Sequence, residues 1–246
     1  MTEWRSSRRN AAPRLRRAAQ GFTLTELAIA FVIIAVALGG LALTLSAQNE
    51  ARQFSETQAR LETAREALIG FAIRNGRLPC PATAASNGLE APAGGGACTA
   101  SLNGYLPGAS LGLAGVSNGY LLDAWDVPIR YAVTNWSTNT FTTNGQVAAK
   151  GVTALNPPLR ICSAAACGSG QVLTAPDTVV AVLYSLGKNR LATGLAADEA
   201  QNQNGDNDFV SHEPRPAGGG GGEFDDLVTW LPLNILVNRM VTAGAL

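Results

Sequence analysis

Apolar positions divide the chain into a long uncharged segment near its start and a later part with short alternating strands. Residues 27–49 are 23 consecutive positions without a charged side chain. As a helix they would span roughly 35 Å at about 1.5 Å per residue, enough for a bilayer core of about 30 Å. We therefore predict a membrane-crossing helix over residues 22–50.

The residues that follow change from uniformly apolar to amphipathic. Phe54, Leu61 and Leu68 recur every seven residues, with charged side chains on the other face. Asn75-Gly76 is a typical end of a helix. We expect residues 51–75 to continue the same helix and to pack their apolar stripe on a sheet, and pairing with a partner helix is the alternative.

The second half of the chain reads as strands separated by loops. Residues 76–119 are rich in turn signals and show little periodicity. Strands are predicted at 129–134, 178–187 and 227–231, a weaker strand or hairpin at 138–149, and a short final helix after Pro232. One long helix followed by about four antiparallel strands predicts an α+β fold with a loop-rich head.

The net charge of zero hides an asymmetry along the chain. Residues 1–21 hold six arginines and one glutamate, which leaves 12 of the 18 basic and 17 of the 18 acidic residues for the remainder. A basic leader before an apolar helix places the N-terminus in the cytoplasm and the rest in the other compartment, the periplasm of a bacterium. A nucleic-acid-binding arm is the alternative for the leader, but the net charge of −5 beyond it argues against nucleic acid as a partner of the head.

Four cysteines agree with an oxidising compartment. Cys80 and Cys98 flank a stretch rich in Gly, Pro and Ala, and Cys162 and Cys167 flank a short Ser-Ala segment. Three connectivities are possible, of which local pairing, 80–98 and 162–167, is the simplest. Free thiols are an alternative, and a zinc site is disfavoured because neither pair has CxxC spacing.

Glu26 is an unexpected residue at the entrance of an apolar segment. A secretory signal peptide or a plain membrane anchor gains nothing from a carboxylate there. If the chain were cut between Gly21 and Phe22, however, a new α-ammonium would arise close by. Glu26 of one subunit could then pair with the Phe22 amine of the next and fix the register of packed helices.

Gly21, Phe22, Glu26 and the apolar run resemble the class III signal of type IV pilins and type II secretion pseudopilins. This resemblance implies cleavage after Gly21 by a prepilin peptidase, N-methylation of Phe22 and a role of Glu26 in assembly. It also implies a cleaved leader (1–21), a transmembrane and filament-core helix (22–50) and a periplasmic head (51–246). The implied partners are the peptidase, other pilin or pseudopilin subunits, and the inner membrane with its assembly platform.

Parts of the head are similar to the major pseudopilin. Asp123-Ala124-Trp125, followed by Pro128 and Tyr131, is one such segment, and Tyr184–Gly187 and Asp225-Asp226 resemble the borders of that protein's calcium loop. The resemblance implies a calcium site. Its candidate ligands are Asp225 and Asp226 with either the Leu186 carbonyl or Asp206 and Asp208.

The acidic loop before Asp225 also has a simpler interpretation. It could be a solvated loop without any ion, although Asp206 and Asp208 stand at the alternating spacing that calcium loops often use. Asn189 occupies a position where the related loop carries Asp, which departs from the pattern. Calcium is therefore an expectation that depends on the geometry of the folded loop.

Two other motifs give no sign of catalysis. The five glycines at 218–222 lack the Lys-Ser/Thr of a phosphate-binding loop, and His212, the only histidine, lies in a Gly/Pro-rich loop without a nucleophile elbow. We expect no enzyme activity. The sequence favours a structural subunit of a type II secretion pseudopilus, with a minor type IV pilin as the alternative and a single-pass envelope protein with an uncleaved anchor as a further one.

Overall fold

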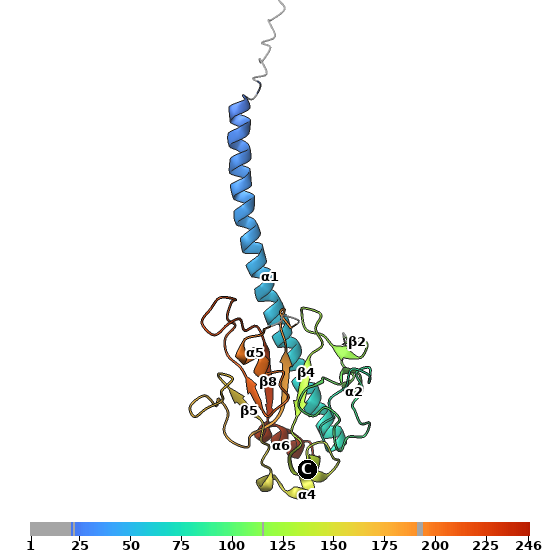
Figure 1. Cartoon of the computed structure of the whole chain (residues 1–246). Coiled ribbons are helices and arrows are strands. Elements are labelled where there is room, and N and C mark those ends of the chain that lie inside the picture. The colour runs from blue at the N-terminus through green and yellow to red at the C-terminus, as the bar shows by residue number, and fades with distance from the viewer. Residues whose placement is uncertain (1–20, 22, 115, 191–193) are drawn as a thin grey trace, which may run out of the picture. The chain divides into compact units, whose positions relative to one another are not determined.

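Helix α1 (Leu24–Asn75) is the first of the elements in the described residues and by far the longest of them (Figure 1). The computed structural model describes residues 21, 23–114, 116–190 and 194–246. The chain divides into two units at residue 50, and residues 50–246 form the unit that holds all the described elements after α1. No helix in the described ranges combines the length and the apolar character that crossing a membrane requires.

The predicted end of the long helix is confirmed. The Asn75 side chain donates a hydrogen bond to the Phe71 carbonyl, and the N–H of Gly76 donates to the Ala72 carbonyl, both at 2.8 Å. Gly76 has a φ of +62°, a left-handed conformation that a Cβ atom disfavours. The chain can therefore turn back directly after the last helical residue.

A four-stranded antiparallel sheet lies at the centre of residues 50–246, with the strand order β1-β4-β6-β8. Its strands are β1 (Gly104–Tyr105), β4 (Arg130–Val133), β6 (Val179–Ser185) and β8 (Leu227–Pro232). All of β6 is buried, as its almost continuous apolar run predicts. The strands predicted at 129–134, 178–187 and 227–231 are thus confirmed, and so is the α+β fold.

One face of this sheet packs on helices. Leu61 and Leu68 of α1 share a buried cluster with Leu183 of β6 and Leu231 of β8. Helix α6 (Leu233–Thr242), the helix predicted after Pro232, contributes to the same cluster. The amphipathic stripe of α1 therefore packs on the sheet, as predicted.

The opposite face of the sheet is covered by a small second sheet. Strands β5 (Arg160–Cys162) and β7 (Asp208–Val210) pair in parallel. Phe209 of β7 shares a second buried cluster with Val182 and Tyr184 of β6. Since neighbouring residues of a strand point to opposite faces, the same strand β6 supplies both clusters.

The strand or hairpin predicted at 138–149 is wrong. The structure has two short helices in this region, α3 (Trp136–Asn139) and α4 (Gln146–Lys150). Phe141 and Val147 are buried in the core, and each is an isolated large apolar residue in a segment that is otherwise polar and rich in turns. The segment therefore offers no alternating apolar face on which a strand could pack.

The remaining elements are short and connect the parts described above. The described residues of the region predicted as loop-rich, 76–119, contain β1, α2 (Gly108–Leu111) and β2 (Val116–Ser117). Strand β3 (Tyr120–Leu121) directly follows this region, η1 (Val152–Ala154) precedes β5, and α5 (Ala197–Gln201) precedes β7.

The predicted local pairing of the cysteines is confirmed. Cys80 bonds to Cys98, and Cys162 bonds to Cys167. The first disulfide closes a loop of the turn-rich region, and the second closes the turn that follows β5. All four cysteines are oxidised.

Candidate functional site

Glu26 lies in a hydrogen-bonded cap at the start of α1. Its Oε2 accepts hydrogen bonds from the Thr23 backbone N–H at 2.9 Å and from the Thr23 hydroxyl at 2.8 Å. The Glu26 N–H in turn donates to Thr23 Oγ1 at 3.3 Å. This reciprocal arrangement is a capping box, which satisfies N–H groups that the first helical turn leaves without partners.

The cap gives Glu26 a local role in addition to the predicted role in assembly. The signal is present in the sequence, since Thr23 and Glu26 have the T-x-x-E spacing of a capping box. Gly21 is exposed, and Phe22 and residues 1–20 lie outside the described residues. The predicted cleavage, methylation and pairing of Glu26 with a neighbour's amine therefore stay predictions.

A second candidate site is a cluster of three carboxylates within residues 50–246. Asp225 and Asp226 directly precede β8, and Glu199 comes from α5. All three are buried, with exposures of 3%, 4% and 1%, respectively. Their carboxylate oxygens lie within 4.8 Å of one another. Three acidic groups are thus close together and almost completely shielded from solvent.

Hydrogen bonds satisfy part of this cluster. Asn189 Nδ2 donates to Glu199 Oε1, and Asn202 Nδ2 donates to Asp226 Oδ2, both at 2.8 Å. Asp225 Oδ2 accepts from the Lys188 N–H at 3.1 Å. These donors fix where the carboxylates point.

One fully buried oxygen of the cluster has no donor among the described residues. Asp225 Oδ1 is buried and has no hydrogen-bond partner among the described residues. A buried polar atom without a partner costs about 1–3 kcal/mol, and more when it is charged. A cation beside Asp225 Oδ1 would remove that cost.

The protonation of the cluster reflects its burial. Burial raises the pKa of Asp226 to about 8, although the hydrogen bond from Asn202 acts in the opposite direction. Burial, followed by the charge of Glu199, raises the pKa of Asp225 to about 6. The cluster thus favours either bound protons or a bound cation over free negative charge.

The structure brings together only part of the predicted calcium ligand set. Asp225 and Asp226 are adjacent, and Leu186 is buried at the end of β6, before Gly187. Gly187 has a φ of +58°, and a Cβ there would come within 2.1 Å of Asp225 Oδ1. The close approach of this turn to Asp225 therefore requires glycine.

Asp206 and Asp208 make their contacts elsewhere. Asp208 forms a bidentate ion pair with Arg160, with distances of 2.7 and 2.6 Å. The Asp206 carboxylate accepts from the side chains of Gln201 and Asn204. Neither belongs to the cluster with Asp225. The third carboxylate beside Asp225 and Asp226 is Glu199. In the sequence, nothing distinguishes Glu199 from the other acidic residues of the same loop.

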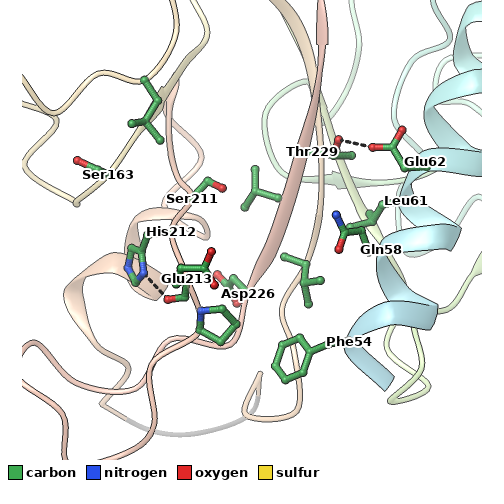
Figure 2. A pocket seen from close by; sticks show the side chains of 14 residues that line it. Phe54, Gln58, Leu61, Glu62, Ser163, Ser211, His212, Glu213, Asp226 and Thr229 are labelled. Carbon is green, nitrogen blue, oxygen red and sulfur yellow. Dashed lines mark hydrogen bonds between the residues drawn. The ribbon is translucent and has the colours of Figure 1, made fainter. Parts of the chain in front are cut away.

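A cleft of about 630 Å³ lies between α1 and the loop after β7 (Figure 2). Its lining includes Asp226 of the carboxylate cluster. The full set of lining residues is Phe54, Gln58, Leu61, Glu62, Ser163, Leu173, Ser211, His212, Glu213, Pro214, Asp226, Leu227, Val228 and Thr229. The cleft is open to solvent and mixes apolar with acidic side chains.

His212 contacts Phe224, Asp198 and Glu213, and none of these contacts is with a serine or cysteine nucleophile. Its ring lies against Phe224, with ring centroids 3.8 Å apart, and Nε2 is 3.2 Å from Asp198 Oδ2. Nδ1 is 2.8 Å from the Glu213 carbonyl oxygen. Among the described residues, the two ring nitrogens thus have partners other than the Ser211 hydroxyl, and the geometry offers no Ser-His pair for nucleophilic attack.

Comparison with known proteins identifies the N-terminal segment. Residues 16–42 match the family profile described as the prokaryotic N-terminal methylation motif. This range contains Gly21, Phe22 and Glu26, the residues on which the resemblance to type IV pilins and pseudopilins rests. The chain thus carries the class III signal that marks pilin-like substrates of prepilin peptidase. No curated protein and no solved structure matches the chain.

Proposed function

We propose that this protein is a structural subunit of a type II secretion pseudopilus. Prepilin peptidase cleaves it after Gly21, Phe22 becomes the methylated N-terminal residue, and the subunit assembles through its N-terminal helix. The observation that carries this proposal is the methylation motif at residues 16–42. The protein is then a substrate of an enzyme and has no catalytic activity of its own.

The proposed location follows from the leader and the cysteines. The arginine-rich leader stays in the cytoplasm, residues 22–50 cross the inner membrane, and the head faces the periplasm before the subunit joins the filament. Two disulfides within residues 50–246 support an oxidising compartment for the head.

Glu26 combines two tasks in this proposal. Both hydrogen bonds from Thr23 go to Oε2, and Oε1 has no hydrogen bond among the described residues. After cleavage, the Glu26 carboxylate accepts the Phe22 ammonium of a neighbouring subunit. The capping box holds the carboxylate at the helix start, and the ion pair fixes the register between apolar helices.

The carboxylate cluster is the proposed calcium site of the head. Glu199, Asp225 and Asp226 present only oxygen ligands, which suit a hard cation such as Ca²⁺. Asn189 cannot supply a carboxylate, and it donates instead to Glu199. Glu199 therefore provides the charge that Asn189 lacks, and a bound ion would link α5 to the residues before β8.

A minor type IV pilin is the second candidate, and the two disulfides in a loop-rich head favour it. Calcium separates the two candidates. A melting temperature of the detergent-extracted full chain that rises with Ca²⁺, and returns to its original value with EDTA, supports the pseudopilus subunit. A melting temperature that does not change with Ca²⁺ would mean that the calcium site no longer supports the assignment as a pseudopilin.

The first experiment measures the N-terminal residue and mass of the membrane-extracted protein in cells with and without prepilin peptidase. We expect methylated Phe22 at the N-terminus, and its loss when the peptidase is absent. An intact Met1, or a start near Gln48, would contradict the proposal and would leave an uncleaved anchor or a secretory signal as the explanation.

A further inference from the structure

Strand β8 leaves one edge of the central sheet open. It is the last strand in the order β1-β4-β6-β8, and it pairs only with β6. Beyond this pairing, the described residues make no further backbone hydrogen bond with residues 227–231. Every second residue of such an edge strand points its N–H and C=O groups away from the sheet.

The cleft of Figure 2 runs along this open edge. Leu227, Val228 and Thr229 are consecutive, and all three line it. Leu227 packs in the cluster shared with α1, whereas Val228 packs in the cluster on the opposite face of the sheet. Residues that point to opposite faces can line one cleft only if the cleft lies at the edge of their strand.

The walls of the cleft would receive the side chains of an added strand. Phe54 and Leu61 come from α1, whereas Leu173 and Pro214 come from the segments that follow β5 and β7. An extended segment paired with β8 would direct alternate side chains to these two sets of residues. Apolar residues at alternating positions would therefore fit both walls.

The charge of the cleft selects a basic occupant. No lysine or arginine is among the described residues that line it, whereas the acidic residues Glu62 and Glu213 are. Glu62 is already paired with Arg65 at 2.7 Å, but Glu213 is exposed and forms no ion pair with any described residue. A lysine or arginine of an incoming segment would find its partner in Glu213.

Over residues 227–230 the edge lacks the features that usually block strand addition, and the register shift in its pairing with β6 lies at the far end, opposite Leu231 and Pro232. Natural edge strands often carry lysine, a proline or a bulge that prevents pairing with another chain. Residues 227–231 are Leu-Val-Thr-Trp-Leu, and Pro232 stands only at the end of the strand. We infer that β8 and its cleft bind an extended segment of another protein, with alternating apolar residues and at least one lysine or arginine, as a fifth strand of the sheet.

The test uses the full chain in detergent and a short fluorescein-labelled peptide in which valine alternates with lysine and threonine. Anisotropy gives the Kd, and hydrogen exchange reports the amides of residues 227–231. We expect saturable binding, and new protection of these amides when the peptide is present. The same peptide with N-methylated backbone amides at alternate positions, and one with glutamate in place of lysine, should each bind about tenfold more weakly or worse.

A pair of charge-reversed variants tests the site on the protein. Glu213→Lys should raise the Kd of the valine-lysine peptide by about tenfold, because it puts two cations together. Glu66→Lys, which makes the same change of net charge at an exposed position outside the cleft, should leave the Kd unchanged. Equal Kd values for both variants would overturn the inference.

Two further outcomes would also overturn it. One is the absence of saturable binding up to about 1 mM, or equal binding of the N-methylated peptide, which would mean that no strand is added. The other is protection of residues 227–231 that grows with protein concentration and does not yield to the peptide, since a second copy of this chain would then be the occupant. Neither outcome bears on cleavage after Gly21, so failure here is distinguishable from failure of the proposed function.

Discussion

The carboxylate cluster predicts that the calcium-free protein loses stability as the pH rises. The perturbation is a change from pH 5 to pH 8 in the presence of EDTA. Asp226 is 4% exposed, and its pKa rises from 3.8 to about 8 on folding. Between these two values the folded state binds more protons than the unfolded state, so the free energy of unfolding falls as the pH rises.

The size of the effect follows from the same pKa values. Each pH unit within this window is worth up to about 1.36 kcal/mol, and the pKa of about 8 limits the slope near its upper end. Asp226 alone should therefore lower the free energy of unfolding by about 4 kcal/mol between pH 5 and pH 8. Asp225, with a pKa raised to about 6, acts in the same direction over the lower part of the range.

Urea unfolding of the detergent-solubilised full chain, followed by tryptophan fluorescence, measures this effect. Asp226→Asn is the matched control, because it keeps an oxygen for Asn202 but cannot ionise. The pH-dependent difference between wild type and variant isolates Asp226 from other titrating groups. Saturating Ca²⁺ should restore stability to the wild type at pH 8 and have a smaller effect on the variant. If the wild type and Asp226→Asn respond to pH identically in EDTA, the reasoning about this cluster is refuted.

Three further predictions concern other parts of the chain. Glu26→Gln keeps the capping geometry but removes the charge. We expect filament assembly, measured by electron microscopy of sheared filaments, to fail in this variant as in Glu26→Ala. If Glu26→Gln assembles normally and Glu26→Ala does not, Glu26 acts only as a helix cap. Leu68→Ala, which removes a buried side chain, should lower the free energy of unfolding in urea by about 2–5 kcal/mol. Glu66→Ala, at an exposed position, should change it by less than about 0.5 kcal/mol. Equal effects of the two substitutions would mean that Leu68 does not pack in the core. Replacement of Cys80 and Cys98 by serine should cost about 3 kcal/mol through the unfolded state, and an unchanged urea midpoint would show that this disulfide does not stabilise the head.

Much of the fold could be predicted because its patterns are local. The heptad spacing of α1 and the end signal at Asn75 identify the helix, and the apolar run of β6 identifies the central strand. The pairing of β5 with β7 could not be predicted, since these strands have three residues each and are far apart in sequence. Such short strands are specified by what packs on them, here the face of the central sheet.

The candidate sites also divide into one that could be predicted from a local motif and one that depends on the folded structure. The class III signal is a contiguous motif, and its residues could be read directly from the sequence. The carboxylate cluster depends on the folding of the loop that brings Glu199 of α5 to Asp225 and Asp226. Spacing favoured Asp206 and Asp208 instead, but Arg160, Gln201 and Asn204 supply their hydrogen bonds, and no spacing rule could have shown this.

The core of the head joins residues that the ribosome makes at very different times. Leu61 and Leu68 of α1 share one buried cluster with Leu236 and Met240 of α6. At about 5–20 residues per second, roughly 10 to 30 s separate the synthesis of these two ends of the core. During that interval the apolar stripe of α1 has no access to α6, and the sheet that covers it lacks its last strand. The nascent chain therefore has a defined period in which a chaperone, or export before folding, must protect α1 from aggregation.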